Sequence, residues 1–143
     1  MLRPLHQADC QAICDINDQA LGYKVSLELT KSQLEKLRFD KHHYLLGYAD
    51  AKTNLLLGYL HAECYESLYS EKGFNILALA VKPDHQGRGI GRRLLAALEK
   101  KARQEKASFI RLNSASHRTE AHAFYRKLSY VDDKTQLRFM KLL

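Results

Sequence analysis

The sequence contains no apolar run of the roughly 18 residues that a membrane-spanning helix requires. Residues 1–9 also lack the apolar core of a secretory signal peptide. Internal repeats, linkers and low-complexity segments are absent, and 143 residues is the size of one ordinary domain. We therefore expect a single cytoplasmic domain over residues 1–143, with no membrane partner.

Cysteine is scarce, and no spacing typical of metal ligands is present. The three cysteines form no C-x-x-C pair, and His42, His43 and His122 have no metal-ligand spacing around them. Neither a disulfide scaffold nor a zinc ribbon is indicated, and we expect no metal. The cysteines are interpreted as small apolar residues in a reducing compartment.

What the sequence does contain is a strand, a glycine-rich turn and a helix in direct succession. Ile76 to Val81 is an apolar run rich in β-formers that stops at Lys82-Pro83-Asp84, which predicts a buried strand. After the three glycines, apolar residues recur at the spacing of a helix: Ile90, Leu94, Leu95, Leu98 and Ala102. The first amides of a helix lack partners within it, and its dipole adds positive charge there, so this junction is suited to an anion such as phosphate.

Two familiar phosphate loops do not fit this junction. A Walker A loop requires Gly-Lys-Ser/Thr, which occurs nowhere in the chain. A dinucleotide fingerprint requires G-x-G-x-x-G, whereas Gly87, Gly89 and Gly91 are spaced G-x-G-x-G, with Arg92 in place of the third glycine. A turn that only connects a strand to a helix remains an alternative at this point.

Two motifs resemble one known family. Gln86 to Gly91 reads Q-x-x-G-x-G and is similar to the [QR]-x-x-G-x-[GA] pyrophosphate loop of the GNAT superfamily of acetyl-CoA-dependent N-acetyltransferases. Ala121 to Tyr130, A-H-A-F-Y-R-K-L-S-Y, resembles the family's later A-x-x-F-Y-x-K-L-G-[FY] segment. The two motifs occur in the family's order, and together they are more specific than either alone.

The resemblance implies an α/β fold of the mixed α+β kind, in which helices flank a twisted sheet. The strand before the glycine loop and the next strand are expected to splay apart and admit the pantetheine arm of acetyl-CoA. The residues expected to bind this cosubstrate are Leu79, Ala80, Val81, Gln86, Gly87, Arg88, Gly89, Ile90, Gly91, Arg92 and Asn113.

The implied reaction is transfer of the acetyl group to a primary amine by direct attack in a ternary complex. The acceptor is a small molecule or a peptide, and the sequence does not distinguish an aminoglycoside, a polyamine, a free amino acid or a protein N-terminus. Backbone N–H groups near Leu79 to Val81 would stabilise the oxyanion, unless sheet pairing occupies them. Tyr125 matches the tyrosine of the family's F-Y pair, which commonly acts as general acid, and a phenol with a pKa of about 10 is protonated at pH 7. Tyr125 also lies on the apolar stripe of its helix, so a packing role is the alternative.

The general base is sought on a hairpin strand. His61, Glu63 and Tyr65 alternate with apolar residues between residues 55 and 66, so they share one face of that strand. Glu63 is the first candidate and His61 the second. Any half-exposed strand shows the same alternation without a catalytic role.

Ser129 departs from the family pattern, which has glycine after Lys-Leu. Glycine suits a left-handed position at the end of a helix, and serine adopts that conformation at a cost. The end of the helix that carries Tyr125 is therefore expected to differ from the family's.

The charge of the chain permits other functions. The net charge is +7, with a pI of about 9.4, and basic residues outnumber acidic ones between residues 82 and 106. We expect no nucleic-acid partner, because no nucleic-acid motif accompanies this charge. A non-catalytic acyl-CoA-binding or sensor module would keep the glycine loop without needing Tyr125, Glu63 or His61. The family's frequent dimers also allow a homodimer.

Other elements are predicted by range. Asp9 is expected to cap a first helix that ends at Gly22, and Thr30 to cap a second after a connection over 23–29. Only the crossover between residues 75 and 113 must be parallel. Strands are expected over 1–6, 44–49, 55–66, 75–81, 109–113, 130–131 and 137–142, and further helices up to residue 105 and from Thr119.

Overall fold

The structure, a computed structural model, describes residues 1–143. The chain forms two compact units, Met1–Leu112 and Asn113–Leu143, and each is described by itself. The first unit contains the whole sheet and the glycine loop, and the second contains the last helix. That residues 1–143 act as one domain stays a prediction.

The first unit is built on a five-stranded sheet in the order β1-β2-β3-β4-β5. Neighbouring strands are antiparallel except β4 and β5, which are parallel because a helix crosses over between them. This confirms the predicted mixed sheet. The strands are β1 (Leu2–Arg3), β2 (His43–Ala49), β3 (Leu56–Ser67), β4 (Ser70–Val81) and β5 (Ile110–Leu112).

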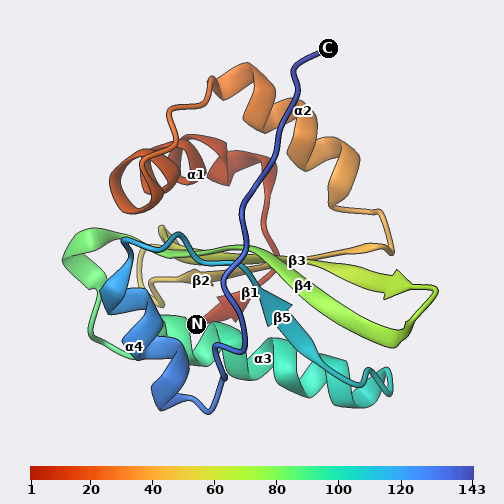
Figure 1. Cartoon of the computed structure of the whole chain (residues 1–143). Helices are drawn as coiled ribbons and strands as arrows, with labels where there is room; N and C mark the ends of the chain where they lie inside the picture. The colour runs from red at the N-terminus through yellow and green to blue at the C-terminus, as the bar shows by residue number, and fades with distance from the viewer. The chain divides into compact units, whose positions relative to one another are not determined.

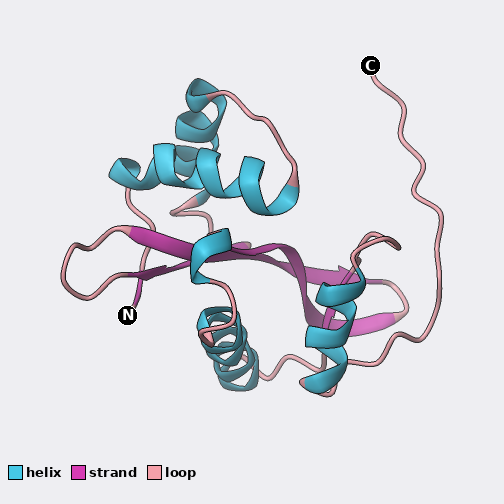
Figure 2. Cartoon of the chain, turned by 90° about the vertical axis from the view of Figure 1, so that its left-hand side faces the viewer, coloured by secondary structure: helices cyan, strands magenta, loops and turns pink.

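Helices cover both faces of this sheet (Figures 1 and 2). On one face lie α1 (Cys10–Ile16), which a π-helical turn extends to Leu21, and α2 (Leu27–Leu37). These helices bury Ile13, Ile16 and Leu34 against Tyr59 and Ala80 of the sheet. On the other face lies α3 (Ile90–Gln104), whose buried residues are those of the predicted stripe, Ile90, Leu94, Leu95, Leu98 and Ala102.

One extra residue in β4 changes which way its side chains point. His61 of β3 pairs with Ala78 and Ala62 pairs with Ile76, so Leu77 has no partner and forms a bulge. Beyond this bulge β4 also loses its other neighbour, because β5 pairs only with residues 74–76. From Leu77 on, β4 therefore continues past the end of β5 without a partner on that side. That the two strands splay apart stays a prediction.

The prediction for the second helix was wrong in its start and its cap. The helix α2 begins at Leu27, and the hydroxyl of Ser26 accepts a hydrogen bond from the backbone N–H of Leu29 at 3.1 Å. Thr30 instead donates its hydroxyl to the carbonyl of Ser26. The predicted connection over residues 23–29 is therefore partly helical, because serine at 26 is the stronger N-cap.

Asp9 also has a different role from the predicted helix cap. Arg3 donates two hydrogen bonds to its carboxylate, at 2.8 and 2.9 Å, and the backbone N–H of His6 donates a third at 2.7 Å. Burial alone would raise the pKa of Asp9, but these hydrogen bonds bring it below its ordinary value. The buried ion pair ties β1 to the start of the first helix.

The second unit contains α4 (Thr119–Lys127) and the residues that follow it. Ser129 takes the left-handed conformation, with φ of 70°, and the N–H of Tyr130 donates to the carbonyl of Tyr125 at 3.0 Å. The rings of these two tyrosines lie 5.8 Å apart. This is the closure that glycine gives, so the prediction that Ser129 changes the end of the helix was wrong.

The strands predicted over residues 130–131 and 137–142 are absent. Residues 130–143 form no helix or strand, and apolar side chains such as Leu137 and Phe139 are more than 80% exposed, at 82% and 89%. An apolar pattern alone does not make a strand, because a strand requires a neighbour for its backbone hydrogen bonds and no strand pairs with this segment.

Candidate active site

The glycine loop lies between β4 and α3, at residues 86–92. Gly87 and Gly89 have φ values of 77° and 80°, and Gly89 is the N-cap of α3. A Cβ atom at either position would meet nothing within 4 Å. The backbone conformation therefore requires glycine, and the space beside both residues is open.

The N-terminus of α3 has free donors. No side chain caps it, and the backbone N–H of Arg93 is the first to bond within the turn, to the carbonyl of Gly89 at 3.0 Å. The preceding amides have no acceptor in the helix, and the helix dipole makes this end positive. Arg88 and Arg92 are exposed beside them. Arg93 instead donates to the hydroxyl of Tyr48 at 2.7 Å.

Gln86 joins the loop to the end of β4. Its side-chain amide donates to the carbonyl of Val81 at 3.0 Å. Between residues 77 and 81, β4 pairs with β3 only, so its N–H groups that point away from β3 have no sheet partner. The loop amides and these unpaired strand amides thus belong to one continuous stretch of backbone.

The uncovered part of the sheet carries the two candidate bases. The ring nitrogens Nδ1 of His43 and Nε2 of His61 lie 2.9 Å apart. Burial, reinforced by the neighbouring His43 and opposed by Glu63, lowers the pKa of His61 to about 4. At pH 7 this ring is neutral and accepts a proton poorly.

Glu63 belongs to a row of polar side chains that crosses three strands. Asn75 donates its side-chain amide to Oε2 of Glu63 at 2.9 Å, and Arg111 donates to Oδ1 of Asn75 at 2.7 Å. The guanidinium of Arg111 lies 4.9 Å from the ring of Tyr65. We call Glu63, Asn75 and Arg111 the charged row.

Sequence reasoning did not find His43, Asn75 or Arg111. These residues are far from His61 and Glu63 along the chain, and the register of the sheet alone brings them together: Glu63 is paired with Asn75, and Asn75 with Arg111. The alternation of side chains within one strand does not carry that information.

Tyr125 and Asn113 belong to the second unit. Within it, the ring of Tyr125 makes edge contacts with Phe124 at 5.2 Å and with Tyr130 at 5.8 Å. Burial raises the pKa of Tyr125 to about 12, so its phenol is protonated at pH 7. The ring contacts agree with a packing role and leave the predicted acid role open.

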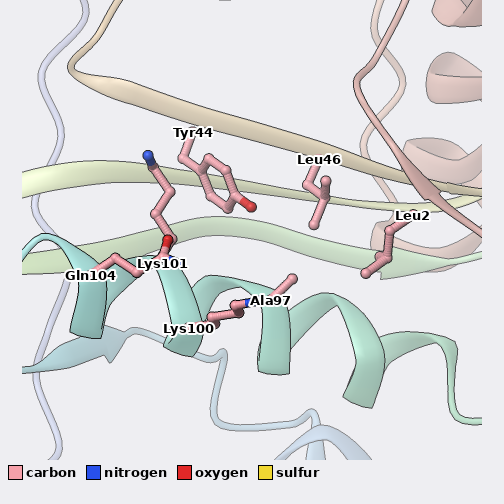
Figure 3. A pocket seen from close by; sticks show the side chains of 7 residues that line it. All are labelled: Leu2, Tyr44, Leu46, Ala97, Lys100, Lys101 and Gln104. Carbon is pink, nitrogen blue, oxygen red and sulfur yellow. The ribbon is translucent and has the colours of Figure 1, made fainter.

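An open groove of about 460 Å³ lies elsewhere in the first unit (Figure 3). Side chains of the sheet form one wall and the second half of α3 forms the other, so the groove is distant along this helix from the glycine loop at its start. None of the predicted site residues lines it. Its residues are Leu2, Tyr44, Leu46, Ala97, Lys100, Lys101 and Gln104.

The structure also bears on metals and membranes. No group of three or more histidine, cysteine or acidic side chains is arranged to hold a metal ion. No helix combines the length and the apolar character needed to cross a bilayer.

Comparison with known proteins settles the family. The model of the acetyltransferase (GNAT) family matches residues 10–130. This chain belongs to the GNAT family. The match includes both motifs on which the sequence resemblance was based, and that identification is confirmed.

One characterised relative matches the chain at low sequence identity. The chain is 28% identical over 107 residues to the L-amino acid N-acyltransferase MnaT of Escherichia coli (strain K12), which is 71% of this chain and 62% of that protein. The chain thus spans less than two thirds of that relative's length.

Solved GNAT structures share the fold. The aminoglycoside 6'-N-acetyltransferase AAC(6')-IG from Acinetobacter haemolyticus has a TM-score of 0.83 at 16% identity, covering 100% of this chain and 99% of its own. AAC(6')-Iy, solved in complex with the bisubstrate analogue CoA-S-monomethyl-acetylneamine, has a TM-score of 0.83 at 12% identity, covering 100% and 98%. At these identities the likeness establishes the GNAT fold, which confirms the predicted fold class.

Proposed function

We propose that this GNAT protein is an acetyl-CoA-dependent N-acetyltransferase that acts on a primary amine. One observation carries the proposal: two left-handed glycines lead into the uncapped N-terminus of α3, beside the part of β4 that has lost its neighbour. A diphosphate next to a strand edge is what such a junction suits.

The proposed binding mode follows the backbone from the loop to the strand. The diphosphate of acetyl-CoA accepts hydrogen bonds from the amides of residues 87–92, and Arg88 and Arg92 supply positive charge. The absence of any atom near a Cβ at Gly87 or Gly89 supports the fit, because a bulky anion needs that open space. The pantetheine arm then lies along residues 77–81, and Asn113 contacts it.

The chemistry is a direct transfer. The amine nitrogen attacks the thioester carbonyl, a C–N bond forms and the C–S bond breaks. Unpaired N–H groups over Leu79 to Val81 stabilise the oxyanion, and each such donor contributes on the order of 3 kcal/mol to lowering the barrier. The proton that leaves the amine goes to a base, and the departing thiolate takes a proton from an acid.

Glu63 is the better candidate for the base. The low pKa of His61 makes its ring a poor proton acceptor, and Nε2 of that ring already contacts His43. Glu63 has one oxygen bonded to Asn75, and its carboxylate has lone pairs left for a proton.

Tyr125 is the proposed acid. Its raised pKa keeps the phenol protonated, but the same burial makes it a weaker acid, so transfer has to accompany cleavage of the C–S bond. We expect Tyr125→Phe to lower kcat by about tenfold or more with little change in the Kd of acetyl-CoA. Wild-type turnover in this variant would remove the assignment.

The acceptor is a primary amine of a small molecule or a peptide. Relatives named above act on L-amino acids and on aminoglycosides. A thiol-release assay with acetyl-CoA and a panel of amines tests the proposal, alongside thermal unfolding with and without acetyl-CoA. Stabilisation by acetyl-CoA without thiol release for any amine would favour the non-catalytic acyl-CoA-binding module instead.

A further inference from the structure

The charged row lies where an acceptor amine would meet the acetyl group. Its three residues are in register on adjacent strands, β3, β4 and β5, and on the same face of the sheet. The pair after Asn75 and Arg111, Ile76 with Leu112, is the last pair between β4 and β5. The row is thus next to the part of β4 that has no β5 partner, along which the proposed thioester lies.

Chemistry fixes the orientation of the amide in the middle of the row. A carboxylate only accepts hydrogen bonds and a guanidinium only donates them, so the nitrogen of Asn75 faces Glu63 and its oxygen faces Arg111. An anion and a cation therefore flank one amide without pairing directly with each other. A carboxylate can accept several hydrogen bonds, and a guanidinium carries five N–H donors.

The spacing of these charges matches a particular ligand. The nitrogen and oxygen of an amide are joined through one carbon atom, whereas the ammonium and carboxylate of an α-amino acid are joined through two. A zwitterion thus needs little more reach than the side chain of Asn75 to contact the same two groups. A carboxylate also suits a guanidinium better than an ammonium would, because the guanidinium can donate two parallel bonds.

Aromatic rings hold the guanidinium in place. It lies 4.9 Å from the ring of Tyr65, which in turn makes an edge contact with Phe109 at 6.2 Å. A planar cation stacked beside a ring has fewer orientations to lose when it binds a carboxylate.

We propose that Arg111 selects the acceptor, and that this acceptor is a free α-amino acid whose carboxylate binds Arg111 while its amine lies at Glu63. The inference rests on the acetyl transfer proposed above. Asn75 is a positioning residue that keeps the two charges apart. Amines that lack the α-carboxylate, such as polyamines and aminoglycosides, are poor substrates.

The test compares amino acids with their decarboxylated counterparts: leucine with 3-methylbutylamine, phenylalanine with phenethylamine and lysine with cadaverine. We expect kcat/KM to favour the amino acid by about tenfold or more for the preferred side chain. Arg111→Gln should raise the KM of that amino acid by about tenfold or more and lower kcat/KM for the decarboxylated amine much less. Arg111→Lys, which keeps the charge but not the fork, should fall between them.

Arg103→Gln is the matched control, because Arg103 is exposed on α3. This variant should keep the wild-type kcat/KM for both the amino acid and the decarboxylated amine. Stabilisation by acetyl-CoA checks that each variant is folded, and Arg111→Lys decides the matter if Arg111→Gln does not fold. Equal use of both members of every pair, or an equal loss for both in Arg111→Lys, would overturn the role of Arg111 while acetyl transfer stands. Thiol release from no amine at all would remove both proposals.

Discussion

The two faces of the sheet are built differently. On the face towards α3, the side chains of Leu60, Ala62, Phe74 and Ile76 are all buried, at 6% exposure or less. On the opposite face, α1 and α2 cover the sheet around Tyr59. Further along the same face, the strands carry His43, His61 and the charged row. One face supplies stability, and the other retains the polar groups that the proposed reaction needs.

The largest expected effect comes from the α3 face. Leu98 is fully buried, so Leu98→Ala should lower the free energy of unfolding by about 3–5 kcal/mol through lost burial and a cavity. Leu29→Ala on α2 is the matched control, because that side chain is 53% exposed. Urea unfolding measures both, and an equal loss in the two variants would contradict this description of the face.

His61 on the other face should make stability depend on pH. Its pKa is about 4 in the folded chain against 6.5 ordinarily, so the unfolded chain binds more protons between these values. Stability is therefore expected to fall by about 3 kcal/mol as the pH drops from 6.5 to 4, at 1.36 kcal/mol per pKa unit.

The variant His61→Asn should flatten that slope, and His117→Asn, which changes an exposed histidine, should not. Unfolding free energies measured at several pH values between 4 and 7 give the comparison. An unchanged slope in His61→Asn would mean that the buried ring is not the source.

Alanine substitutions at two left-handed glycines allow the effect of backbone strain to be distinguished from an effect on ligand binding. Gly22 and Gly89 have φ of 75° and 80°, and a Cβ at either meets nothing within 4 Å. Alanine should cost each site about 1–2 kcal/mol of stability. Gly89→Ala alone should also weaken acetyl-CoA binding, by about tenfold, because its methyl group stands beside the loop amides. Calorimetric titration decides, and equal affinity in both variants would place the cosubstrate elsewhere.

The smallest effect on folding and the clearest on function is expected at Glu63. Glu63→Gln should lower kcat by about tenfold or more while stability changes little, because an amide oxygen can still accept from Asn75. Glu66→Gln is the control, since Glu66 is exposed on the same strand and alternation places it on the opposite face. Full activity of Glu63→Gln across a pH series would exclude this residue as the base.

The sequence predicted the parts of the fold that depend on neighbouring residues. The apolar stripe of α3, the glycines at 87 and 89 and the parallel crossover are all local patterns with one physical solution. The family motifs added the architecture, because they connect a short pattern to a known fold.

What the sequence could not predict depends on residues distant along the chain. Pairing of Glu63 with Asn75 requires the sheet register, which the bulge at Leu77 changes by one residue. At Ser129 the local sequence predicted a change in the helix end that the structure does not have. Hydrogen bonds and a ring contact around Tyr125 and Tyr130 offset the strain of a left-handed serine.

The bulge at Leu77 also determines which side chains fit beneath the helices. Before it, Ile76 points towards α3; after it, Ala78 and Ala80 point towards α1. If Leu77 were paired and the bulge lost, strict alternation would turn the two alanines towards α3 and send Leu79 and Val81 into the space under α1, where Tyr59 already fills the core. Deleting Leu77 itself would remove only the unpaired residue and leave the other pairs between β3 and β4 in register, so the packing of both layers should be retained, and its exposed side chain can also be replaced at little cost.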